Sequence, residues 1–96
     1  MVKHIVMLDL KETNKKENLI KLKMMLESLL ESISTLKGME VGINFSTEER
    51  AMDLSLYATF EDQVGLEAYA IHPAHLEVVQ FIKSVATISK VSDYTL

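Results

Sequence analysis

The stretch VKHIVMLDL, residues 2–10, decides how this chain can fold. Its length and its content of Val, Ile and Leu predict a strand, in which alternate residues face opposite sides. His4 and Val6 share one side, whereas Ile5 and Met7 share the other. A strand that is apolar on both sides must be covered twice. We expect the chain's own helices to cover one side and a second copy of the chain to cover the other.

A long amphipathic helix is predicted next, over residues 14–36. Asn14 and Glu17 match a variant of the capping box at its start, and Gly38 is placed to end it in a left-handed conformation. The apolar residues of this helix recur at spacings of three and four: Leu19, Leu22, Leu26, Leu29, Ile33 and Leu36. Since the stripe spans only about two and a half heptads between two strands, it favours packing on a sheet over a coiled coil.

Three further strands are predicted from alternating apolar and polar residues. Residues 39–46, MEVGINFS, place Phe45 on the same side as Met39, and residues 53–60, DLSLYATF, continue the pattern after a polar connection typical of a hairpin. The tail ISKVSDYTL, residues 88–96, predicts a last and weaker strand.

A pair of helices is predicted between the last two strands. Asp62 is placed to cap a short helix that runs to about Ala70. Pro73 suits the first turn of the next helix, because proline lacks an amide proton and its fixed φ fits that position. This helix should run to about Ala86 with three apolar residues on its buried face: Leu76, Val79 and Ile82.

The resulting order is strand, helix, strand, strand, helix pair, strand. This βαββαβ pattern predicts an α+β, ferredoxin-like protomer, in which helices cover one face of a four-stranded antiparallel sheet. The 96 residues suffice for one small domain, residues 1–96. The other face of the sheet would stay bare in a single chain, so two sheets meeting face to face would form a dimeric α+β barrel.

Composition excludes several classes of function. The chain carries 14 acidic and 10 basic residues, and the basic residues form no dense patch of the kind that binds nucleic acid. It contains no cysteine, which excludes disulfides, thiolate nucleophiles and cysteine-based zinc sites. No apolar run reaches the roughly 20 residues needed to cross a bilayer. We expect a soluble, cytoplasmic protein that contacts neither membrane nor nucleic acid.

Three motifs carry a resemblance to a known family. VKHIVML stands at the start, LEAYAIHPAH in the third quarter and VSDY near the end. In this order and spacing the sequence resembles the stress-responsive dimeric α/β-barrel family, called Dabb. The resemblance implies a homodimer joined through its sheet faces, with no cofactor. Members of this kind include proteins without a known reaction and a polyketide cyclase, and the same fold houses cofactor-free monooxygenases.

The resemblance also implies site residues, and three interpretations of them stay open. In the cyclase branch a Tyr and a His at the positions of Tyr69 and His75 are the catalytic pair: His75 would be a general base, and Tyr69 would donate a hydrogen bond to a growing oxyanion. Alternatively the two residues contact a small apolar ligand, or they only stabilise the helix junction. His4 faces the same side and is expected to contact a ligand.

His72 is expected to cap the helix that starts at Pro73, and we also count it among the candidate ligand contacts. His72 and His75 are three residues apart, and Glu77 follows closely. Because no third and fourth ligand is defined, we predict no metal site. The chain has only three Tyr, three Phe and no Trp, which favours a small apolar pocket over one for a large flat substrate.

Overall fold

A computed structural model describes all 96 residues of the chain. Its elements follow one another in the order predicted from the sequence: β1 (Val2–Leu10), α1 (Lys15–Ser32), β2 (Gly38–Ile43), β3 (Leu54–Phe60), α2 (Gln63–Ala70), α3 (Pro73–Val85) and β4 (Ala86–Thr95). No helix combines the length and the apolar content that crossing a membrane would require.

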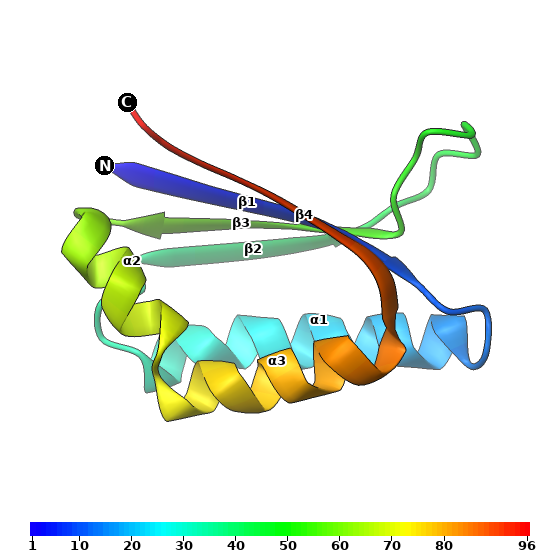
Figure 1. Cartoon of the computed structure of the whole chain (residues 1–96), viewed down its shortest axis with the longest axis horizontal. Coiled ribbons are helices and arrows are strands. Elements are labelled where there is room, and N and C mark those ends of the chain that lie inside the picture. The colour runs from blue at the N-terminus through cyan, green and yellow to red at the C-terminus, as the bar shows by residue number, and fades with distance from the viewer.

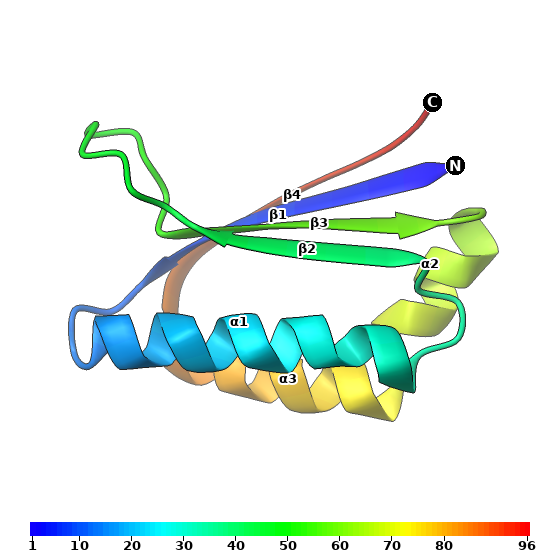
Figure 2. The ribbon, with the colours of Figure 1, turned by 180° about the vertical axis from the view of Figure 1, so that it is seen from behind.

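The four strands form one sheet in the order β2-β3-β1-β4, and every neighbouring pair is antiparallel. Helices α1 and α3 lie side by side beneath one face of this sheet, and nothing covers the opposite face (Figure 1). The view from behind shows the same two layers (Figure 2). The ferredoxin-like plan predicted from the sequence is therefore confirmed.

The strand register decides which side chains meet the helices. Val6 of β1 lies opposite Leu56 of β3 and Val91 of β4, and paired residues share a face. The helix-facing residues of β1 and β3 are largely buried, and the core includes Leu8, Leu54 and Phe60 without any exposed surface. This sheet face and the helices enclose one cluster of 17 buried apolar residues, among them the whole predicted stripe of α1.

The ends of α1 differ from the prediction. Asn14 adopts a left-handed conformation (φ 53°), and its side chain makes no capping bond, so the predicted capping box is wrong. The helix stops at Ser32, and Ile33 is extended. Gly38 does not end it: it opens β2, and its φ is not positive. The chain turns early because Lys37 must donate its backbone N–H to Thr59, at 2.9 Å, to start the pairing of β2 with β3.

Two other predictions need correction, the end of β2 and the buried face of α3. β2 ends at Ile43, and the side chain of Phe45 is 97% exposed instead of lying in the core. The buried face of α3 is formed by Val78 and Val85 with Ile82 packed beside them, whereas Leu76 is 48% exposed. The α3 face is shifted because the sheet and α1 approach this helix from a direction that periodicity alone does not specify.

Candidate functional site

The junction between α2 and α3 is built by local capping. Asp62 accepts a hydrogen bond from the backbone N–H of Gly65 at 2.8 Å and so caps α2, as predicted. Pro73 occupies the first turn of α3. His72 caps α3, since its Nδ1 accepts a hydrogen bond from the backbone N–H of Ala74 at 3.1 Å. The capping bond occupies one of the two ring nitrogens of His72.

Tyr69 lies in the last turn of α2 and is 1% exposed. Its ring packs against Phe60, with the two centroids 5.1 Å apart, and against the imidazole of His75, with the centroids 4.2 Å apart. Burial raises the pKa of its hydroxyl to about 12, so the group is a neutral donor at physiological pH. The Tyr69 hydroxyl makes no hydrogen bond within the chain, although no fully enclosed polar side-chain atom is without a partner.

His75 lies in the first turn of α3 and is half-buried. Its Nδ1 lies 3.1 Å from the carbonyl oxygen of Ala70, which requires that Nδ1 carry the proton and donate it. Desolvation is the largest effect on His75 and lowers its pKa; the hydrogen bond to Ala70 opposes this shift, whereas the nearby His4 and His72 add to it. The neutral ring therefore presents Nε2 as a lone-pair acceptor with no partner in the chain.

His4 enters the same cluster from β1. The cross-strand register places it opposite Asp93 of β4, and its Nδ1 pairs with the Asp93 carboxylate. The His4 ring lies edge-on to Tyr69, with centroids 6.1 Å apart, and to Phe60, at 6.4 Å. Asp93 belongs to the VSDY motif, but its contact with His4 depends on a strand register that the sequence alone does not reveal.

The structure thus brings together His4, Tyr69 and His75, and leaves His72 at the helix start. The rings of His75 and Tyr69 lie side by side, and the His4–Asp93 pair lies next to Tyr69. Such a set can hold a carbonyl or hydroxyl group, or move a proton at a carbon beside a carbonyl. No group of three or more His, Asp and Glu side chains is arranged to hold a metal ion.

The main cavities of the chain lie outside this cluster. None of the five main cavities is lined by Tyr69 or His75, because core side chains fill the space between sheet and helices. The nearest cavity, about 300 Å³, borders Asp93 at the end of the sheet, with Val2 and Leu66 among its lining residues. Asp93, which pairs with His4, is the residue that this cavity shares with the surroundings of the cluster.

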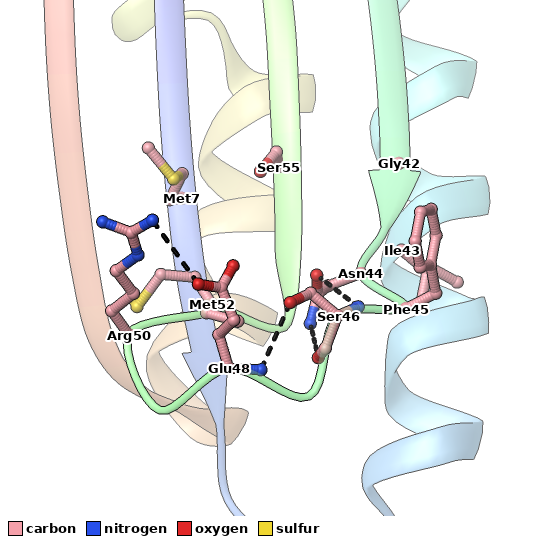
Figure 3. A pocket seen from close by; sticks show the side chains of 11 residues that line it. Met7, Gly42, Ile43, Asn44, Phe45, Ser46, Glu48, Arg50, Met52 and Ser55 are labelled. Carbon is pink, nitrogen blue, oxygen red and sulfur yellow. Dashed lines mark hydrogen bonds and ion pairs between the residues drawn. The ribbon is translucent and has the colours of Figure 1, made fainter.

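The largest cavity, about 480 Å³, lies on the uncovered face at the other end of the sheet. Figure 3 shows Met7, Ser55 and Gly42 on three neighbouring strands, with the connection between β2 and β3 beside them. None of the candidate site residues lines this cavity.

Comparison with a family model gives a match to the stress-responsive A/B barrel domain over residues 2–96. A comparison with curated proteins found no match.

Solved structures with the same fold cover nearly the whole chain. A dimeric protein of unknown function from Bacteroides fragilis is 26% identical, with a TM-score of 0.90, over 99% of this chain and 95% of that one. A protein of Arabidopsis thaliana is 24% identical, with a TM-score of 0.89, over 100% and 95%. A hydroxynitrile lyase from Passiflora edulis is 18% identical, with a TM-score of 0.88, over 99% and 92%.

Proposed function

The chain belongs to the stress-responsive A/B barrel family, and on that premise we propose that it is a homodimer that binds a small, mainly apolar molecule beside Tyr69 and His75. The observation that carries the ligand proposal is the contact between the Tyr69 and His75 rings, each of which has one polar atom, the hydroxyl and Nε2, without a hydrogen-bond partner in the chain.

The uncovered sheet face supports the homodimer. Ile5 and Tyr57 are half-buried there, and Met7, Ile88 and Tyr94 are at least 40% exposed. An apolar sheet face is stable when another layer covers it. The Bacteroides fragilis relative is described as dimeric, which supports a second copy of this chain as that layer.

The chemistry of the cluster supports a ligand with one polar group. Val2 and Leu66 offer apolar contact in the cavity beside Asp93. Tyr69 would donate a hydrogen bond to a carbonyl or hydroxyl oxygen, and His75 Nε2 would accept one from a hydroxyl. A buried polar group costs free energy unless it is paired, so a ligand that satisfies both atoms would gain affinity.

Titration of the ¹⁵N-labelled protein with cyclohexanone, a small apolar ketone, tests this proposal by NMR. We expect chemical-shift changes at residues 69–75. We expect Tyr69→Phe to weaken binding about fivefold, since one neutral hydrogen bond contributes about 1 kcal/mol. Ser28→Ala, which removes an exposed hydroxyl from α1, is the control and should bind as the parent does. Equal affinity in Tyr69→Phe would refute the assignment of the hydroxyl as the donor.

A second candidate function is cofactor-free proton transfer, favoured by the free Nε2 of His75 and by the contact of its ring with Tyr69. His75 Nε2 would take a proton from a carbon next to a carbonyl, and the electron pair of that C–H bond would move onto the carbonyl oxygen. Tyr69 would stabilise the resulting enolate by a hydrogen bond. The protonated His75 would then return the proton to the same carbon or to another one.

Exchange of the α-protons of cyclohexanone in D₂O separates the two candidates. Catalysis predicts an exchange rate above the buffer rate that falls about 10²-fold or more in His75→Gln, because general base catalysis typically contributes that much. Lys83→Gln, at the exposed end of α3, is the control and should keep the parent rate. Binding without any exchange enhancement would leave the ligand proposal in place and exclude proton transfer for this ketone.

A further inference from the structure

The connection between β2 and β3, residues 44–53, rises from the sheet on the side away from the helices. We call it the arm. Both views show it standing clear of the uncovered face at the end opposite the two termini (Figures 1 and 2). A layer seated on the uncovered face would therefore lie beside the arm.

The base of the arm is fixed to the sheet by Asp53. Its carboxylate accepts a hydrogen bond from the backbone N–H of Leu10 at 2.8 Å and pairs with Lys15 at 3.1 Å. Its backbone N–H donates to the carbonyl oxygen of Leu8, and its carbonyl accepts from the N–H of Asn44, both at 2.9 Å. Four interactions at one residue hold the arm in a defined direction.

The arm is also bonded within itself. The Asn44 side chain accepts from the Ser46 backbone N–H at 3.0 Å and donates to the Ser46 carbonyl at 2.8 Å. The Ser46 hydroxyl accepts from the N–H of Glu48 at 3.2 Å, and Glu48 pairs with Arg50 at 3.4 Å (Figure 3). A preorganised surface loses little conformational entropy when it binds a partner.

Three residues of the arm are of the types enriched in protein interfaces. Aromatic residues, Met and Arg are over-represented there. The arm carries Phe45 with 97% of its surface exposed, Arg50 with an 87% exposed side chain, and Met52, and the largest cavity joins them to Met7 of the uncovered face. Nothing within the chain explains an aromatic ring left almost wholly in water.

We propose that the arm is a docking surface for a second copy of this chain, on which Phe45 becomes buried. The inference rests on the proposed homodimer and assigns part of its interface. The occupant is a second copy because the cavity is continuous with the uncovered sheet face through Met7 and Ser55. Any sheet packed on that face, at the usual spacing of about 10 Å, would meet the flank of the arm.

Sedimentation equilibrium on the full chain tests this docking surface. Phe45→Ser should raise the dimer dissociation constant at least about tenfold, as expected for an aromatic interface residue. Its folding should not change, because the side chain contacts almost nothing in the protomer. Ile71→Ser replaces a residue that is 75% exposed at the junction of α2 and α3, and it should leave the dissociation constant unchanged.

Hydrogen exchange on the parent protein gives a second, mutation-free measurement. Amide protons of Ser46 and Glu48 should exchange more slowly at high protein concentration than at low concentration. A dimeric parent whose Phe45→Ser variant dimerises equally well would overturn the inference and leave the homodimer intact. A parent that stays monomeric at about 100 µM, a concentration that well exceeds the dissociation constants of typical specific dimers, would overturn both.

Discussion

Tyr69 and His75 come from different helices, yet their rings lie 4.2 Å apart between centroids, with their planes inclined by 38°. The helix break before Pro73 changes the direction of the chain. Tyr69 in the last turn of α2 and His75 in the first turn of α3 therefore come into contact. Each ring is held by packing or by one backbone hydrogen bond, and each keeps one polar atom free. The first two predictions concern this pair.

The first prediction concerns the protonation of His75. Desolvation lowers its pKa below the ordinary value of 6.5, so at pH 7 the ring should be neutral with the proton on Nδ1. Nitrogen chemical shifts from long-range ¹H–¹⁵N NMR spectra should show Nε2 unprotonated. A neutral ring that carries its proton on Nε2 would contradict the assigned hydrogen bond to Ala70, and a ring that titrates above 6.5 would show that desolvation is not the largest effect on its pKa.

The second prediction gives the consequence for stability. Below pH 6.5 the unfolded chain binds a proton at His75 that the folded chain resists, so the free energy of unfolding should fall as pH drops through that window. His75→Gln removes this contribution. Urea unfolding at pH 7.5 and pH 5 should therefore show a smaller loss of stability in the variant than in the parent. An identical loss in both proteins would mean that folding does not shift the pKa of His75.

The third prediction separates the ring of Tyr69 from its hydroxyl. Since the hydroxyl has no protein partner, Tyr69→Phe should change the free energy of unfolding by less than about 1 kcal/mol. Tyr69→Ala removes a ring that is 1% exposed and should cost about 3–5 kcal/mol. Denaturant unfolding measures both. A loss above about 2 kcal/mol in Tyr69→Phe would reveal a buried bond to the hydroxyl.

The fourth prediction concerns Gly38. A Cβ at this position would lie 2.7 Å from Oγ1 of Thr59, closer than such atoms approach. Gly38→Ala should therefore cost about 1–3 kcal/mol, and adding Thr59→Ala should recover most of that loss. Gly42 lies on the same face of the same strand with nothing within 4 Å of the added atom, so Gly42→Ala should not destabilise the protein. Equal losses at both glycines would point to backbone conformation instead of the contact with Thr59.

The fifth prediction concerns the base of the arm. Asp53→Ala removes a charged acceptor from the backbone N–H of Leu10 and should cost about 1.5–3 kcal/mol. Glu48→Ala removes an ion pair with Arg50 at the exposed tip and should change stability by less than about 0.5 kcal/mol. Urea midpoints of the two variants make the comparison. If both variants lose equally little, Asp53 does not anchor the arm.

Much of the fold could be predicted because its signals are local. The stripe from Leu19 to Leu36 is buried as expected, although the last two members lie beyond the end of the helix. Asp62 and Pro73 start α2 and α3 where capping and the fixed φ of proline favour a helix start. The predictions were wrong for the cap at Asn14, the helix end at Gly38 and the strand at Phe45. At these three positions the path of the chain between sheet and helices overrides the local sequence preference.

The sequence by itself determined the order of elements, the two-sided first strand and the cluster of Tyr and His residues around Pro73. These follow from periodicity and from backbone chemistry, which act over a few residues. The tertiary structure alone decided that His4 pairs with Asp93 and that Asp53, at the base of the arm, accepts a hydrogen bond from the backbone N–H of Leu10. The partners in these contacts are 89 and 43 residues apart, and the register that joins them depends on the packing of the whole sheet.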